Sequence, residues 1–262
     1  MGRAYTLSEY IPKGEPIGAA LIKMGSTSSG KFHVVINGKP VQLTTANFLG
    51  IYMPLHELFT FSIHRKLYAQ AAKAAKGSVA DLGCGTGKFI GYLRGIDSYT
   101  GIDINPAALS LAEARVQAAG FLAEVRQGNI CDESQIPGSY DTIISLLAAY
   151  LAGPSLLDCI SQKVKPKGNI VIASVTPSFS VKSLEGIVEP EAEQMVAQGQ
   201  VARQEWENYK SCNYFIASSG VKVHAWTCQE IGAELVRRKF EVVENTLMWG
   251  GNLFYVEAKK MP

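Results

Sequence analysis

The clearest chemical pattern in the chain is an acid followed by glycines at alternate positions, Asp81-Leu82-Gly83-Cys84-Gly85-Thr86-Gly87. Asp81 and Leu82 end the run 78–82, which is typical of a strand buried on both faces, and the glycines directly follow it. Glycine has no Cβ, so such a run permits a tight turn. A ligand could then lie against backbone N–H groups at the N-terminus of the next helix. The pattern therefore predicts a ligand-binding turn at the end of a strand.

Spacing separates the ligand classes that use glycine-rich turns. A nucleoside-triphosphate loop requires Gly-Lys followed by Ser or Thr, but Phe89 follows Lys88 here, so that class is excluded. A dinucleotide fingerprint, G-x-G-x-x-G, would need glycine where Lys88 stands, so that class is disfavoured. An acid followed by G-x-G-x-G remains.

A second carboxylate, Asp103, ends the next predicted strand, 99–104. An acid about 20 residues beyond such a turn commonly binds ribose hydroxyls. The alternative is that Asp103 only caps the helix that begins near Asn105. Because the glycine turn precedes it at the right place, we favour the ribose role.

The elements that must position these residues alternate between strand and helix. A helix with Asn105 as N-cap extends to Gly120, and another begins at the Thr227 capping box. Strands are predicted at 78–82, 99–104, 123–127, 141–146, 169–174, 241–246 and 252–259. The alternation predicts an α/β fold with a doubly wound, mostly parallel seven-stranded sheet and helices on both faces.

Two stretches do not fit this core and are predicted to form a lid. Residues 1–76 form an N-terminal lid or cap segment, and 77–262 form the core, with an insert after the fifth strand at about 176–225. Within the lid, the run 31–43 predicts a hairpin turning at Asn37-Gly38. A helix is expected from about His56 to Lys76.

Composition excludes several classes of protein. The chain has 262 residues, 47% hydrophobic and 18% charged, which excludes disorder and coiled coils. A net charge of +2 does not indicate a nucleic-acid partner. The five cysteines have no zinc-ligand spacing, so we expect reduced thiols and no metal. Without a signal peptide or a membrane-length apolar run, a cytoplasmic protein without membrane association is expected.

With these motifs in place, residues 77–260 resemble the class I S-adenosylmethionine-dependent methyltransferases. Their acid and G-x-G-x-G motif is matched in full, and their ribose-binding acid is matched by Asp103. Where the family commonly has Asp for the adenine amine, this chain has Asn129. The resemblance implies S-adenosylmethionine as cofactor. It also implies these cofactor-binding residues: Asp81, Gly83, Cys84, Gly85, Gly87, Asp103, Ile104, Asn129, Ile130 and Ser145.

The long lid resembles the caps of methyltransferases that enclose small molecules, so we expect a small-molecule acceptor in a capped pocket. The run after the fourth strand, Ser145 to Tyr150, lacks the N/D-P-P-Y motif of many nucleic-acid methyltransferases. A monomer or homodimer is expected. Candidate bases are His56, His64, Tyr68 and His224, although helical spacing explains the first three equally well as packing residues.

Two other functions stay open at this point. The fold could bind S-adenosylmethionine and transfer or cyclise its aminobutyrate arm, releasing methylthioadenosine. It could also be a non-catalytic binding module, although the intact turn and Asp103 argue against that.

Overall fold

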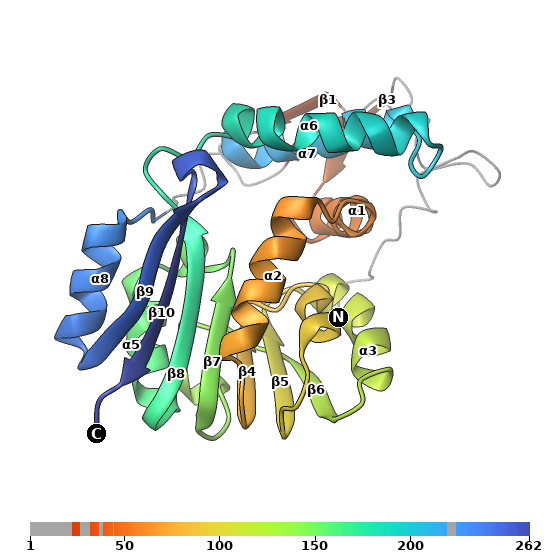
Figure 1. Cartoon of the computed structure of the whole chain (residues 1–262). Helices are drawn as coiled ribbons and strands as arrows, with labels where there is room; N and C mark the ends of the chain where they lie inside the picture. Colours follow the sequence, from red (N-terminus) through yellow and green to blue (C-terminus); the bar gives the residue numbers. More distant parts are fainter. Residues whose placement is uncertain (1–22, 27–31, 37–38, 44, 219–223) are drawn as a thin grey trace. The chain divides into compact units, whose positions relative to one another are not determined.

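A seven-stranded sheet forms the centre of one of the two units into which the chain divides (Figure 1). The computed structural model describes residues 23–26, 32–36, 39–43, 45–218 and 224–262, with side chains at 52–213 and 224–262. The core unit is Ile63–Ser180 with Lys222–Pro262, and the second unit is Met1–Ser62 with Val181–Val221. Residues 1–62 of the N-terminal segment thus share a unit with most of the insert, whereas residues 63–76 belong to the core unit. The first 22 residues of the expected lid lie outside the described residues.

The strand order in the core sheet is β6-β5-β4-β7-β8-β10-β9, and β10 is antiparallel to both of its neighbours. The chain moves outward from β4 to β6 and then returns to β7 on the other side of β4. The doubly wound, mostly parallel sheet is therefore confirmed, and the strand order reverses at β4. The strands are β4 Ser78–Leu82, β5 Ser98–Asp103, β6 Leu122–Gln127, β7 Tyr140–Leu146, β8 Val164–Val175, β9 Phe240–Met248 and β10 Leu253–Lys260.

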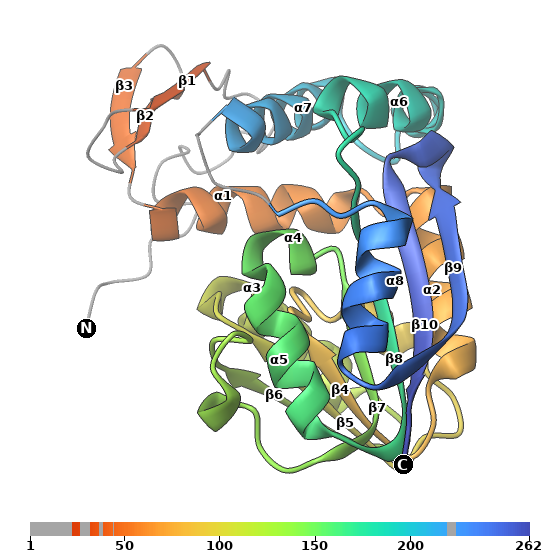
Figure 2. The same ribbon diagram turned by 90° about the vertical axis from the view of Figure 1, so that its left-hand side faces the viewer.

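Helices cover both faces of this sheet. Figure 1 and Figure 2 show α2 on one face and α5 and α8 on the other. The predicted caps are present: the Asn105 side chain accepts from Ala107 N–H, and Thr227 and Glu230 form a capping box. The helical segments of this unit, including short 3-10 turns labelled η, are α2 Ser62–Ala74, η3 Lys88–Tyr92, α3 Pro106–Gln117, η4 Glu133–Gln135, α4 Ala149–Ala152, α5 Pro154–Lys163, α8 Cys228–Arg237 and η5 Trp249–Gly251.

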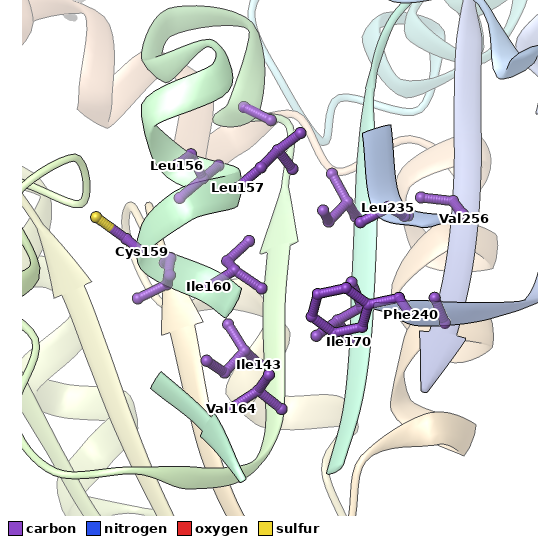
Figure 3. Close-up of a cluster of buried hydrophobic side chains, with 14 of the residues drawn as sticks. Ile143, Leu156, Leu157, Cys159, Ile160, Val164, Ile170, Leu235, Phe240 and Val256 are labelled. Carbon is purple, nitrogen blue, oxygen red and sulfur yellow. The ribbon is translucent and has the colours of Figure 1, made fainter. Parts of the chain in front are cut away.

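The main core lies between the sheet and the helices α5 and α8 (Figure 3). Leu156 and Ile160 of α5 and Leu235 of α8 are fully buried there, against Ile143 of β7 and Ile170 of β8. Burying one such side chain contributes about 1.5–3 kcal/mol. The apolar strand runs seen in the sequence are these central strands, covered on both faces.

Two expected elements differ from the structure. Strand β8 begins at Val164, five residues before the predicted start at 169, and Lys167 has φ 63° where the pairing with β7 is irregular. The expected helix from His56 to Lys76 is two helices, α1 Thr45–Leu58 and α2. The break places the rings of Phe59 and Phe61 in one buried aromatic cluster, 5.7 Å apart. Burial of both rings outweighs the helical periodicity that predicted one continuous helix.

The second unit combines a small sheet with helices. Strands β1 Lys23–Ser26, β2 Phe32–Ile36 and β3 Lys39–Leu43 form an antiparallel sheet. Ile36 pairs with Lys39, as expected for the hairpin, whose turn at 37–38 lies outside the described residues. Helices α6 Val181–Ala197 and α7 Arg203–Ser218 complete the unit, with Trp206 and Tyr209 of α7 packed against Phe59. In the part of the chain that the structure describes, no helix has the length and apolarity to cross a membrane.

Asp141 joins the amino-terminal ends of β4 and β7. Its Oδ2 accepts from Ser78 N–H at 2.9 Å, Ser78 Oγ at 2.7 Å and Lys165 Nζ at 2.9 Å. These hydrogen bonds, chiefly those from Ser78, lower the Asp141 pKa to about 2. A carboxylate stabilised in this way contributes stability above its unfolded pKa, and the contribution is lost as pH falls through about 2.

We expect Asp141→Ala to lower the free energy of unfolding by about 1–3 kcal/mol at pH 7, because Ser78 and Lys165 lose their acceptor. Urea denaturation measures the change. Asp97→Ala, at an exposed aspartate, is the control and should alter stability by less than about 0.5 kcal/mol. The deficit should shrink between pH 4 and pH 2; a deficit independent of pH would contradict the role of the Asp141 charge.

Candidate cofactor site

The candidate site lies at the carboxyl ends of β4, β5 and β7, where the strand order reverses. The turn 83–87 follows β4, while Asp103 ends β5 and Ala148 lies just beyond β7. Open α/β sheets bind ligands at this edge, because adjacent connections diverge to opposite faces and leave a crevice. The turn and the second acid, found separately in the sequence, are therefore brought to one place.

The three glycines of the turn all have positive φ, 82° at Gly83, 53° at Gly85 and 75° at Gly87. Their surroundings differ, however. A Cβ on Gly83 would lie 2.2 Å from Ala148 Cβ, and one on Gly87 would lie 3.0 Å from Ala112 Cβ. These two glycines permit close packing. A Cβ on Gly85 would meet no atom of the described residues within 4 Å, so on this part of the chain Gly85 borders unfilled space.

Most backbone N–H groups of the turn point into the protein. The carbonyl of Ile102 on β5 accepts from Gly83 and Cys84, at 2.7 and 3.2 Å. Gly85 N–H donates to Asp103 Oδ2 at 2.8 Å, and Gly87 N–H donates to Cys84 O at 3.0 Å. The expectation of free N–H groups at a helix N-terminus is therefore wrong for these four amides. The helix after the turn is only the five-residue η3, which has little dipole to offer.

Asp103 links the turn to the end of β5. Its Oδ2 accepts from Gly85 and its Oδ1 accepts from Asn105 N–H at 2.9 Å. The cap of α3 is made by Asn105 itself, whose Oδ1 accepts from Ala107 N–H at 3.1 Å. A carboxylate has about four acceptor positions, so Asp103 retains the capacity to bind ribose hydroxyls.

Asp81 is buried beneath the turn, 3% exposed. The Tyr99 hydroxyl on β5 donates to its Oδ2 at 2.9 Å. Burial raises the Asp81 pKa to about 7; the hydrogen bond from Tyr99 opposes this, and the charge of Asp103 adds to it. Burial likewise raises the pKa of the Cys84 thiol, so Cys84 is a neutral packing group beside the two acids.

The other predicted cofactor residues surround the turn. Ile104 is 67% exposed directly after Asp103, and Ile130 Cδ1 lies 3.7 Å from the Cβ position of Gly83. Asn129 is exposed, and its Oδ1 accepts from Cys131 N–H at 2.9 Å. Ser145 is fully buried and donates to the Leu82 carbonyl at 2.9 Å, which joins β7 to β4. Their cofactor roles stay predictions.

The four candidate bases lie in different surroundings. His64 is buried edge-on against Trp249, with ring centroids 5.3 Å apart, and Tyr68 packs against Phe89 and Tyr92. His224 is exposed, and its ring lies tilted against that of Trp226, with ring centroids 4.2 Å apart. His56 belongs to the second unit, beside Tyr52 and Tyr209.

Two residues that the sequence analysis missed support the turn. Arg115 of α3 donates to the Thr86 carbonyl at 2.8 Å, and Tyr99 holds Asp81. For Tyr99 a signal was present, since it stands two residues before Gly101, on the same face of the strand. For Arg115 there was none, because its partner is a backbone carbonyl far away in the sequence.

Asp81→Asn should change stability in a pH-dependent way. The folded-state pKa of about 7 exceeds the ordinary aspartate value of 3.8, so the stabilisation by the neutral form is complete below pH 3.8 and lost as pH rises through about 7. The variant carries no charge at any pH. We therefore expect its stability relative to the unmodified chain to increase from pH 5 to pH 8 in paired denaturant titrations. An equal difference at both values would mean that Asp81 does not titrate in this range.

Comparison with known proteins agrees with this geometry. Residues 79–168 match the methyltransferase domain family. The chain is 31% identical to a phthiotriol/phenolphthiotriol dimycocerosates methyltransferase of Mycobacterium leprae over 129 residues. The aligned part covers 45% of this chain and 46% of that relative. A second such protein, of Mycobacterium ulcerans, is named as probable and is 28% identical over 47% of this chain and 50% of the relative. The chain thus spans about half the length of the curated relatives it matches.

Solved structures share the fold. The N-methyltransferase NodS of Bradyrhizobium japonicum, in complex with S-adenosyl-L-homocysteine, has a TM-score of 0.54 at 14% identity, over 80% of this chain and 97% of that one. Magnesium protoporphyrin IX methyltransferase of Synechocystis, with bound S-adenosyl-L-homocysteine, has a TM-score of 0.50 at 14% identity, over 84% of this chain and 89% of that one. The matched stretch contains both the glycine turn and the acid that ends β5, so residues 79–168 of this chain are similar to the methyltransferase domain family in the region of the candidate site.

Proposed function

We propose that this protein transfers a methyl group from S-adenosylmethionine to a small-molecule acceptor. The observation that carries the proposal is the space beside Gly85, which no atom of the described residues fills and which adjoins Asp103, the acceptor of the Gly85 N–H. A site with these features fits a ligand that has an amino-acid end and a ribose.

Different residues around the turn would contact different parts of such a ligand. Asp81 and the glycines would surround the methionine half, and Asp103 would accept from the ribose hydroxyls. The exposed Ile104 and the neighbouring Ile130 offer apolar surface for the adenine, with Asn129 able to accept from its amine. Cys84 and Ser145 act by shaping the turn and the strand edge. When bound, S-adenosylmethionine supplies a methyl group activated by a sulfonium.

The direction of the turn amides supports this cofactor over a dinucleotide. A pyrophosphate is bound by several free N–H groups at a helix N-terminus. Four of the N–H groups in this turn already have protein acceptors, and η3 is short. The turn therefore suits a ligand recognised by shape and by carboxylates.

The chain leaves and re-enters the core unit near the carboxyl edge of the sheet. Helices α6 and α7 follow β8, which ends at Val175 at that edge. The chain returns to the core near His224, whose N–H donates to the Tyr150 carbonyl just beyond β7. His224 therefore lies at the same edge of the sheet as the candidate cofactor site.

A small-molecule acceptor is further supported by the relatives. The mycobacterial relatives are named as phthiotriol/phenolphthiotriol dimycocerosates methyltransferases, and the structural neighbours include a magnesium protoporphyrin IX methyltransferase and an N-methyltransferase. In-line methyl transfer requires mainly orientation and exclusion of water, with a base only for an acidic nucleophile. Of the four candidate bases, His224 has an exposed ring at a junction on the carboxyl edge, so it is the first to test.

Gly85→Val should weaken S-adenosylhomocysteine binding by more than tenfold in calorimetry, because two methyl groups would enter the space left for the ligand. Gly95→Val is a matched control: Gly95 also has positive φ, 65°, with nothing within 4 Å of its Cβ position, but it lies outside the turn. Both variants place a valine at positive φ and therefore have the same kind of backbone strain. Only a loss of affinity that occurs in Gly85→Val and not in Gly95→Val supports the site. Equal affinities would place the cofactor elsewhere.

Product analysis tests the reaction itself. The protein is incubated with S-adenosylmethionine and a panel of small hydroxyl, amine and carboxyl compounds. We expect acceptor-dependent formation of S-adenosylhomocysteine, with Gly85→Val as the inactive control. Methylthioadenosine would instead indicate use of the aminobutyrate arm, and cofactor binding without any product would indicate a binding module.

A further inference from the structure

Tyr99 reaches Asp81 across a strand position that has no side chain. Asp81 on β4 pairs in register with Gly101 on β5, and Tyr99 stands two residues before Gly101 on the same strand. A Cβ on Gly101 would lie 2.9 Å from the Tyr99 hydroxyl and 2.9 Å from Cys84 Sγ. The tyrosine therefore lies over the glycine, and its hydroxyl donates to Asp81 Oδ2 at 2.9 Å.

The second oxygen of Asp81 is left for another donor. Among the described residues, no group donates a hydrogen bond to Asp81 Oδ1, and Asp81 is buried, with 3% of its surface exposed. A buried carboxylate with one oxygen held and the other open can bind a cation, such as an ammonium group, through a charge-assisted hydrogen bond. Rotation of the carboxylate would remove this arrangement, and the Tyr99 hydroxyl opposes such rotation.

Other ionisable groups around Asp81 come from each neighbouring element. On β5 and in the turn these groups are Tyr99, Asp103 and Cys84. On β7, the residue that pairs with Asp81 is Ile144, which is apolar. Beyond the turn stand Lys88 at the start of η3, Arg115 of α3, which donates to Thr86, and Tyr68 of α2, which packs against η3. Of the contacts that act on the Asp81 pKa, the hydrogen bond from Tyr99 lowers it, whereas Asp103 raises it.

We propose that Tyr99 is a positioning residue for cofactor binding: its hydroxyl orients the Asp81 carboxylate and keeps it available, as an anion, for the amino group of the cofactor's methionine half. This inference rests on the proposed function. It follows that Tyr99 and Asp81 act as a pair and that Gly101 is needed for the pair to form. Tyr99 itself touches no reacting atom.

Tyr99→Phe isolates the hydroxyl, because the ring stays in place. Without this donor the ionised form of Asp81 is less stable, so its pKa rises above about 7. We expect the affinity for S-adenosylhomocysteine, measured by calorimetry from pH 5.5 to 8.5, to fall about tenfold at pH 7 and to recover at higher pH. In the Asp81→Asn background, the same change should leave the pH profile unaltered.

Tyr140→Phe is the matched control, since it removes another buried tyrosine hydroxyl from the same sheet. It should leave the pH profile of binding unchanged. A Tyr99→Phe protein that loses affinity equally at every pH, or only melts earlier, would overturn the proposal and return Tyr99 to a packing role. Gly101→Ala is a second route to the same effect, because its Cβ would displace the hydroxyl.

The ligand-free protein separates failure of this inference from failure of the proposed function. Carbon-13 NMR of labelled aspartate carboxyls follows the titration of Asp81 without any cofactor. An upward shift of that titration in Tyr99→Phe supports the pairing even if the unmodified chain binds no S-adenosylhomocysteine, which would refute the proposed function alone. An unchanged titration overturns the pairing whatever the binding result.

Discussion

The tie between the glycine turn and the end of β5 is the interaction on which the candidate site depends. The Ile102 carbonyl and the Asp103 carboxylate together accept three N–H groups of the turn. Because β4 and β5 are adjacent parallel strands, their carboxyl ends meet at one edge, so each can orient the other. The same contacts that close the turn also fix Asp103 beside it.

Steric contacts hold the turn from two further sides. Gly83 lies against Ala148, which follows β7, and Gly87 lies against Ala112 of α3. A side chain at either glycine would push the turn away from the sheet or from the helix. Of the three turn glycines, only Gly85 has no atom of the described residues near its Cβ position, so the packing that immobilises the turn leaves the space for the proposed ligand on that side.

A buried acid at this position costs stability, and in the proposed function it serves binding. Burial favours the neutral form of Asp81, whereas a cationic ligand would favour the charged form. Binding of an ammonium group and ionisation of Asp81 would therefore be coupled. Such local conflict between stability and charge is typical of functional sites.

Much of the core could be predicted from the sequence, because its signals are local. The strand at 78–82 and the caps at Asn105 and Thr227 were predicted correctly, since apolar runs and capping residues act within a few positions. The single helix from His56 was wrong because periodicity does not reveal where Phe59 and Phe61 are buried.

The sequence by itself determined the family motif, the order of the core elements and the two acids. Only the tertiary structure decided that four turn amides have protein acceptors, that among the three turn glycines only Gly85 has no described atom near its Cβ position, and that Tyr99 reaches Asp81 over Gly101. The physical reason is distance along the chain: these contacts join residues on different strands and helices, and no local spacing rule specifies which donor meets which acceptor once the sheet is assembled.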